Sequence, residues 1–257
     1  IYGVNKFDTL SGAGSIFELD INSNSLTYQV SLDVIGAVRP MEGLVEASNG
    51  KLYGTTKDGG ANGMGCIYEF DSNTHTLSLL HSFSGDSCGK NPMGGLCEGL
   101  PGVLYGINST SDITGNSVLY SYDIALDTVM VLHDMQTYGS GIHGTLKKAS
   151  NGKMYGATRI GGVTNSGVIF EYDPLSNVFA KKLDFSASTN GYAPFHSGML
   201  QYNNDKLYGF TGYGGANNSG VIYEYDPISD TYTVKKHLSV DQGSVWGSTF
   251  CEAYNGK

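Results

Sequence analysis

Short apolar stretches recur along the whole sequence, separated by turns rich in Gly, Asn and Asp. In the segment 39–90, four such stretches lie at 43–47, 51–56, 66–70 and 76–83 and are rich in Val, Ile, Leu, Tyr and Phe. Their lengths and composition are typical of β-strands, and the Asn-Gly and Asp-Ser-Asn sequences between them are typical of tight turns. No helix is needed to account for the pattern, so it predicts an all-β protein.

The pattern repeats along the chain. A Tyr-Gly pair recurs at intervals of 51, 52, 50 and 53 residues, at Tyr2, Tyr53, Tyr105, Tyr155 and Tyr208. Each of these tyrosines is followed 18 residues later by an Asp that ends an apolar run. The Gly-Gly pair at 59–60 and its equivalents lie between the second and third strands of the repeat. Neither a helix pattern nor Lys-Ser/Thr follows them, so they are loop residues and not a phosphate-binding loop.

Repeats of four strands and about 50 residues are the signature of β-propeller blades. In the third strand, Tyr68 and Phe70 point to one side of the sheet and Ile67 to the other, so a neighbouring blade is expected on each side. The C-terminal residues 252–257 match residues 46–51, and joining Lys257 to Ile1 restores the repeat. We therefore predict one five-bladed β-propeller, closed by pairing of the C-terminal strand with the N-terminal blade. The predicted blades of this single domain, 1–257, are 1–38 with 246–257, 39–90, 91–140, 141–192 and 193–245.

The run "GLVEASNGKLYGTTKDGGANGMGCIYEFD", at residues 43–71, resembles the tandem GloVer repeat of secreted and surface-anchored bacterial proteins. The resemblance extends over essentially all five repeats. It implies an extracytoplasmic propeller but no particular reaction, because such proteins are mostly uncharacterised.

Composition and charge exclude several classes of function. Lys and Arg number 15 against 24 Asp and Glu, which gives a formal charge of −9. Nucleic acid is therefore not an expected partner, since phosphate binding needs clustered cations. No apolar run is long enough to span a membrane. The low charged fraction of 15%, with 37 Gly and 18 Tyr, favours an extracellular or cell-surface location. The chain begins at Ile1 without a signal peptide, as expected of a mature form or a portion of a longer protein.

Four cysteines, Cys66, Cys88, Cys97 and Cys251, show no spacing typical of a zinc site. Cys66 begins a third strand and Cys88 lies in the connection that leaves the same blade, so this pair is the candidate disulfide. The alternative is Cys88–Cys97. Cys97 and Cys251 occupy equivalent inner-strand positions and are expected to be buried thiols. No cofactor is predicted.

The connections from blade to blade contain the variation in length, and binding residues usually lie on such loops. The candidate binding residues are aromatic side chains and histidines of these connections: Tyr138, His143, Tyr192, Phe195, His196 and Trp246. They suit stacking on sugar rings or contact with a protein. In the alternative reading, Phe195 and Trp246 fill the central channel. No carboxylate converges with the two histidines, so a metal is not predicted there.

Inner-strand carboxylates are the candidates for an enzyme. Glu46, Glu98 and Glu252 occupy one position of the inner strand, replaced by Lys148 and Gln201 in the other blades. Such acids would suit a glycan-active hydrolase or lyase; alternatively, they are solvated residues near a turn. Near-identical blades favour a binding or assembly protein, because catalysis needs one asymmetric constellation whereas repeated weak sites gain avidity. Self-assembly of the chain is a further expectation.

Overall fold

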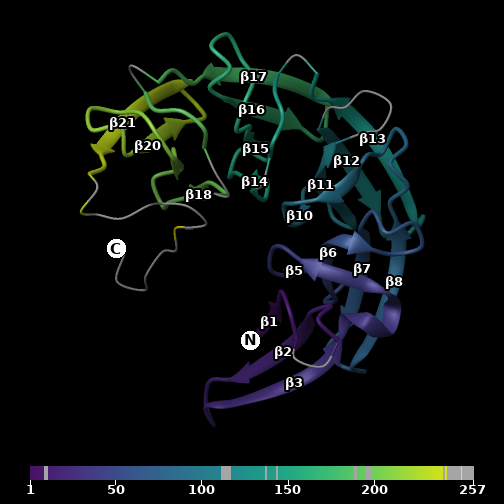
Figure 1. Ribbon diagram of the computed structural model, residues 1–257. Helices are drawn as coiled ribbons and strands as arrows, with labels where there is room; N and C mark the ends of the chain where they lie inside the picture. Colours follow the sequence, from purple (N-terminus) through teal and green to yellow (C-terminus); the bar gives the residue numbers. More distant parts are fainter. Residues whose placement is uncertain are drawn as a thin grey trace. The chain divides into compact units, whose positions relative to one another are not determined.

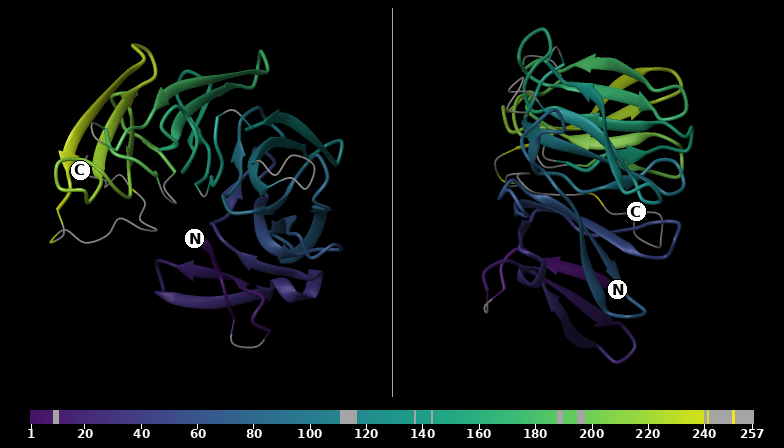
Figure 2. Two further views of the ribbon diagram at one scale, coloured as in Figure 1. Left: turned by 45° about the horizontal axis from the view of Figure 1, so that its top comes forward. Right: turned by 90° about the vertical axis from the view of Figure 1, so that its right-hand side faces the viewer.

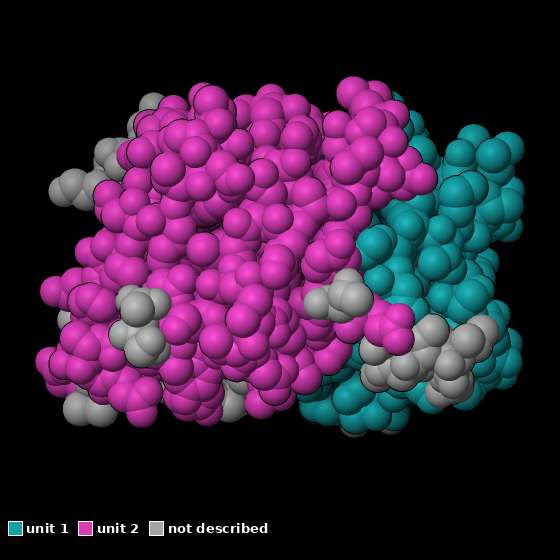
Figure 3. Space-filling model, turned by 90° about the horizontal axis from the view of Figure 1, so that it is seen from above, with its two compact units in different colours: residues 1–134 teal, residues 135–257 magenta. Residues whose placement is uncertain are grey.

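Two compact units, residues 1–134 and 135–257, make up the chain in the computed structural model (Figures 1 and 3). The structure describes residues 1–8, 11–110, 117–136, 138–142, 144–187, 190–194, 198–239, 241 and 250. Within these residues the only helix is a four-residue 3-10 helix, Leu32–Ile35. Every strand pair is antiparallel, so the predicted all-β class is confirmed.

Unit 1 contains three antiparallel sheets, one for each repeat, and Figure 2 shows them from two further sides. The first sheet has three described strands, and the other two have an added inner strand and a short strand from the preceding connection. The strands are β1 (Tyr2–Asn5), β2 (Ser15–Asp20) and β3 (Ser25–Ser31); β4 (Ala37–Pro40), β5 (Val45–Glu46), β6 (Leu52–Gly59), β7 (Cys66–Asp71) and β8 (Thr76–Ser82); and β9 (Lys90–Pro92), β10 (Cys97–Glu98), β11 (Val103–Thr110), β12 (Val118–Asp123) and β13 (Thr128–Asp134).

Unit 2 contains two sheets of four strands, each in the order of the sequence. We call each sheet with its loops a blade and number the blades 1 to 5 along the chain. The strands are β14 (Lys147–Lys148), β15 (Met154–Ala157), β16 (Val168–Asp173) and β17 (Val178–Asp184) in blade 4, and β18 (Leu200–Gln201), β19 (Leu207–Phe210), β20 (Val221–Asp226) and β21 (Thr231–His237) in blade 5. The predicted strand of residues 251–257 lies outside the described residues.

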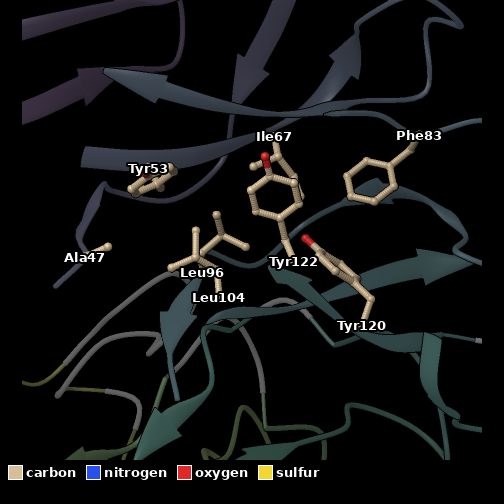
Figure 4. Close-up of a cluster of buried hydrophobic side chains, with 8 residues drawn as sticks. All are labelled: Ala47, Tyr53, Ile67, Phe83, Leu96, Leu104, Tyr120 and Tyr122. Carbon is tan, nitrogen blue, oxygen red and sulfur yellow. The ribbon is translucent and has the colours of Figure 1, made fainter. Parts of the chain in front are cut away.

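The core of each unit lies between consecutive sheets. Tyr68 and Phe70 of β7 pack against Ile16 of blade 1 in one buried cluster. Ile67, on the same strand, belongs to a second cluster shared with Tyr120 of blade 3 (Figure 4). The two sides of β7 are therefore covered by different neighbours, as the alternation of side chains predicted. A third cluster fills the space between the two sheets of unit 2.

One contact recurs in all five blades and explains the Tyr-Gly pairs of the sequence. The third-strand aromatic ring lies directly across the glycine of the second strand. A Cβ placed on any of these glycines would approach the ring or its hydroxyl to within 2.3–2.4 Å. These glycines do not have a positive φ, so space and not backbone conformation requires them. The five pairs are Gly3–Phe17, Gly54–Tyr68, Gly106–Tyr120, Gly156–Phe170 and Gly209–Tyr223.

The outer strand of every blade contains a bulge at the same place. The register shifts on the third strand just before the aromatic residue that covers the glycine, for example between Ile67 and Tyr68. The same shift occurs in the other four blades. Bulges twist an edge strand and hinder pairing with other chains, and Lys181–Lys182 and Lys235–Lys236 add charge to two of these edges.

Replacing Gly156 by Ala is expected to destabilise the fold by about 1–3 kcal/mol, because the new Cβ would lie 2.3 Å from the Phe170 ring. Gly43→Ala is the matched control, since no atom lies within 4 Å of a Cβ there and its φ is not positive. Urea unfolding of the two variants measures the difference. Equal stability of both variants would contradict the steric explanation of the Tyr-Gly pair.

Candidate functional site: the connection loops

The connections between blades are joined to the loop between the second and third strands of the next blade by short antiparallel bridges. In blade 5 the bridge pairs Tyr192 with Tyr213 through two backbone hydrogen bonds of 3.0 and 3.2 Å. The two half-buried rings stack, with centroids 5.2 Å apart and planes at 23°. This double attachment holds a pair of aromatic rings in one fixed arrangement on a loop.

The same bridge in other blades presents different chemistry. Ser140 pairs with Ile160 in blade 4, and Lys90 pairs with Thr110 in blade 3. In blade 2 the bridge includes Asp58, whose carboxylate forms an ion pair with Arg39. Among the bridges that the structure describes, blade 5 therefore has the aromatic one.

Hydrogen bonds to the end of the outer strand fix the loop between the second and third strands. In blade 5 the Asn217 amide donates to the Leu238 carbonyl at 3.1 Å, and His237 Nδ1 accepts from the Ala216 N–H at 3.1 Å. In blade 4, Thr164 and Asp184 make the equivalent bonds to Phe185 and Val163. The loop conformation is therefore set by repeated hydrogen bonds, while the bridge residues vary.

Two of the predicted binding residues lie within the described chain, and they have different surroundings. Tyr192 faces Tyr213, a partner that the sequence prediction missed. Tyr138 instead packs against Phe179 of β17, with ring centroids 4.9 Å apart. Its ring therefore contacts the outer strand of blade 4. His143, Phe195, His196 and Trp246 lie outside the described residues. The structure therefore brings one predicted residue into an aromatic pair on the loops.

Among the inner-strand acids proposed for catalysis, Glu98 connects two blades. The Glu98 carboxylate accepts hydrogen bonds from the Ser48 N–H and hydroxyl of blade 2 and from the Gly102 N–H, at 2.7–3.1 Å. Gln201, at the same position of blade 5, accepts from the Ser150 N–H and donates to its hydroxyl, both at 2.9 Å. The side chain at this position therefore joins the inner strand of its own blade to the first turn of the preceding blade. Glu46 is exposed in β5, and Glu252 lies outside the described residues.

The third-strand glutamates form a second repeated network. In blade 4 Lys153 Nζ lies 2.7 Å from Glu171 Oε1, and the Tyr155 hydroxyl donates to Oε2 at 2.5 Å. Asn151 donates to the same hydroxyl at 2.9 Å. Blade 2 repeats the arrangement with Lys51, Tyr53 and Glu69, and blade 5 repeats it with Lys206, Tyr208 and Glu224.

Three members of these networks have shifted pKa values. The hydrogen bond to Glu171 raises the pKa of Lys153. Burial raises the pKa of Tyr53 to about 12. The hydrogen bond from Tyr208 lowers the pKa of Glu224 below its ordinary value of 4.5. The hydrogen bonds and ion pairs hold Glu69, Glu171 and Glu224 within their own blades, which assigns them to the scaffold.

The predicted Cys66–Cys88 disulfide is not formed. Cys66, Cys88 and Cys97, the cysteines that the structure describes, are all free, which also excludes the alternative Cys88–Cys97 bond here. Cys66 belongs to the cluster between blades 1 and 2, whereas Cys88 packs against the cluster between blades 2 and 3. The two thiols therefore lie on opposite sides of the blade 2 sheet. The Cys66 sulfur is instead 3.1 Å from the Thr56 hydroxyl.

No group of three or more His, Cys, Asp or Glu side chains within the described ranges is arranged to hold a metal ion. In the same part of the chain, no helix has the length and apolar character needed to cross a membrane.

Consecutive antiparallel sheets that pack face to face within each unit define a β-propeller-like repeat protein. The chain belongs to the Gloeobacter/Verrucomicrobia repeat family, whose model matches residues 1–196 and, in an overlapping match, residues 89–257. The resemblance to the GloVer repeat is thereby confirmed. No curated protein matches the chain.

Solved structures share the fold at low sequence identity. TolB from Acinetobacter baumannii is similar with a TM-score of 0.58 and 15% identity over 93% of this chain and 53% of TolB. The extracellular domain of a protein assigned as a one component system from B. thetaiotaomicron gives a TM-score of 0.60 and 12% identity over 92% of this chain and 28% of that one. A chain of the nidogen/laminin complex gives a TM-score of 0.59 and 13% identity over 90% of this chain and 74% of that one. The chain spans about half the length of TolB, and these likenesses show the fold alone.

Acidification is expected to weaken the fold through Glu224. Because its pKa is lower in the folded protein than in the unfolded chain, its stabilising effect is complete above the unfolded value and is lost as the pH falls through the folded value. We expect the free energy of unfolding to fall from about pH 5 towards pH 3, and less steeply in Glu224→Gln. Urea unfolding across this range measures the slope.

Tyr208→Phe provides the control, because it removes the hydrogen bond that lowers the pKa of Glu224 most. NMR titration of this variant should show the pKa of Glu224 moving up towards 4.5. An unchanged titration in Tyr208→Phe, or equal slopes for Glu224→Gln and the unaltered protein, would show that the network does not act on stability in this way.

Proposed function

We propose that the protein is an extracellular binding domain that engages glycans or proteins through its connection loops. One observation carries the proposal: repeated hydrogen bonds hold the loops in equivalent conformations, while the bridge residues differ from blade to blade. A constant support with variable loop chemistry is the usual arrangement of binding proteins. The stacked Tyr192–Tyr213 pair is the candidate contact surface on the described loops.

Aromatic rings held in a fixed orientation suit both classes of partner. Such a ring offers a flat apolar face for a sugar, and tyrosine is enriched at the centres of protein interfaces. The contact with one ring pair is small, so useful affinity requires several loops acting together or several copies of the domain. The proposed surface also includes the other candidate residues, because they lie in the same kind of connection between blades as Tyr192 does. They are Tyr138, His143, Phe195, His196 and Trp246.

The extracellular location rests on three supports. The family of tandem repeats, the extracellular domains among the similar structures, and the low fraction of charged residues all agree with it. The similar chain of the nidogen/laminin complex belongs to an assembly of proteins, which supports a protein partner for this chain as well. A role in assembly of several copies is part of the same proposal.

Catalysis is the weaker alternative. The proposed hydrolase or lyase would use the acids of the inner strand, and Glu98 already accepts three protein hydrogen-bond donors. A carboxylate committed to a neighbouring turn is poorly placed to transfer a proton to a substrate. We therefore favour binding over turnover.

We further propose that the five repeats form one closed five-bladed propeller within a single domain. The first sheet has three described strands, β1 to β3, and has no counterpart of the inner strand that the other four sheets possess. Cys251 and Glu252 repeat the Cys-Glu sequence of the inner strand β10. In the register of blade 3, Cys97 lies opposite Tyr105, so the equivalent residues of the proposed closure are Cys251 and Tyr2.

Tyr2→Cys tests this closure. Neighbouring residues of an antiparallel pair lie about 4.5–5.5 Å apart at Cα, within the range of a disulfide bond. Under oxidising conditions the variant is expected to form an intramolecular disulfide with Cys251, detected as a linked peptide by mass spectrometry. Tyr2→Cys combined with Cys251→Ser is the control. A disulfide-linked dimer would instead show that another copy supplies the strand, and an unlinked monomer would reject the closure.

Replacing Tyr192 and Tyr213 together by Ala is expected to weaken binding roughly tenfold or more on an array of immobilised bacterial and plant polysaccharides. Tyr28→Ala is the matched control, because Tyr28 is a tyrosine of the outer strand β3 with 51% of its surface exposed. Thermal unfolding must show both variants folded. If the control loses as much binding as the double variant, the surface is wrongly placed; if the unaltered protein binds no glycan, the partner is not a glycan.

A further inference from the structure

Three buried tyrosine hydroxyls have no hydrogen-bond partner among the residues that the structure describes. They belong to Tyr68, Tyr120 and Tyr223, which are fully buried third-strand residues of blades 2, 3 and 5. The same position holds Phe17 in blade 1 and Phe170 in blade 4. The fold therefore does not need the hydroxyl, and a buried hydroxyl without a partner is unfavourable.

Blade 3 differs from the others because Asn108 Oδ1, a second polar atom without a partner, lies on the same side of its sheet as the Tyr120 hydroxyl. Asn108 is fully buried, its amide nitrogen donates to the Cys88 carbonyl at 2.6 Å, and its Oδ1 has no partner within the described chain. Leu104, Gly106 and Asn108 alternate along β11 and face blade 2, since Leu104 belongs to the cluster between these blades. The Tyr120 hydroxyl lies over Gly106, two residues from Asn108.

The orientation of the Asn108 amide is determined by its surroundings. If nitrogen and oxygen were exchanged, Oδ1 would face the Cys88 carbonyl and two acceptors would meet. The oxygen must therefore be the atom that points away from Cys88. An acceptor and a hydroxyl, which can donate or accept, remain in one buried space.

Three of the other blades satisfy the equivalent position internally, and in blade 1 this position is Asn5, which is exposed. Thr56, Thr158 and Thr211 occupy the place of Asn108, and each hydroxyl bonds within its own blade. In blade 5, for example, the Thr211 hydroxyl donates to the Tyr213 carbonyl at 3.0 Å and accepts from the Val221 N–H at 3.1 Å. Asn108 is thus the substitution that leaves an acceptor unused.

We propose that an ordered water molecule is bound between blades 2 and 3 by the Tyr120 hydroxyl and Asn108 Oδ1. The Cα atoms of Gly106 and Asn108 are about 6.6 Å apart, and the Asn108 side chain extends from its Cα into the space on the same face of the strand. A water with two hydrogen bonds of about 2.8 Å joins polar atoms up to about 5.6 Å apart. The water donates to Asn108 Oδ1 and accepts from the Tyr120 hydroxyl, so both buried atoms gain a partner. In Figure 4 the Tyr120 hydroxyl points into the middle of the cluster between the blades.

The direction of the change in stability tests the proposal. Tyr120→Phe is expected to lower the urea midpoint, because it removes one of two protein partners of the water and leaves Asn108 poorly satisfied. Tyr68→Phe is the matched control: its hydroxyl is equally buried, but Thr56 beside it already bonds within blade 2. The control should leave the midpoint unchanged or raise it. A midpoint that also rises in Tyr120→Phe would overturn the proposal.

A double-mutant cycle and a structure decide the remaining alternatives. Asn108→Thr copies the residue of blades 2, 4 and 5, and combined with Tyr120→Phe it should cost less than the sum of the two single changes. Additive effects would show that the two groups share no water. A high-resolution crystal structure should show a water within hydrogen-bond distance of both atoms, and a protein atom in that place would reject the site.

Discussion

The fold depends on the contact between a third-strand aromatic ring and the glycine of the second strand in the same blade. Any side chain at the glycine would enter the space of the ring, as the 2.3–2.4 Å approach of a Cβ shows. The ring in turn forms part of the cluster that joins its blade to the preceding one, as Tyr68 does for blades 1 and 2. Packing within a blade and packing between blades are therefore one interaction, and a change to either partner affects both.

Two polar networks join the strands and blades in addition to this apolar contact. The Lys-Tyr-Glu network ties the second and third strands near the first turn of the blade, as Lys153, Tyr155 and Glu171 show. The inner-strand residue Glu98 or Gln201 then ties that turn to the next blade. Both networks lie near the turns between the first and second strands. The connection loops at the other end of the sheets are consequently free of these constraints and can differ in sequence.

Much of this architecture can be predicted from the sequence, because the repeat displays it several times. The strand positions of blade 2 and the opposite orientation of Ile67 and Tyr68 follow from spacing and alternation alone. The polar roles are harder to predict, since spacing does not show which blade a side chain reaches. Glu98 was a candidate acid, yet its partner Ser48 lies 50 residues away in the preceding blade.

The disulfide was mispredicted for a related reason. Cys66 and Cys88 were expected to emerge at the same end of one blade, but the thiols face different neighbouring sheets. Tyr213 was missed because the Gly-rich loop that follows the Tyr-Gly strand was interpreted only as a connection between strands. Its signal was present: the position that holds Asp58 in blade 2 and Ile160 in blade 4 is aromatic in blade 5.

The distribution of repeated and varied residues indicates where activity can reside. The covering rings of blades 2 to 5 are buried, and a recurring buried group cannot distinguish one blade from another for a ligand. Selectivity must come from positions where the blades differ while the backbone remains the same. The bridge residues meet both conditions, because Asp58, Ile160 and Tyr213 stand at one backbone position with three different chemistries. Under the proposed binding function, each blade would therefore offer a partner a different side chain at this position, although the scaffold repeats.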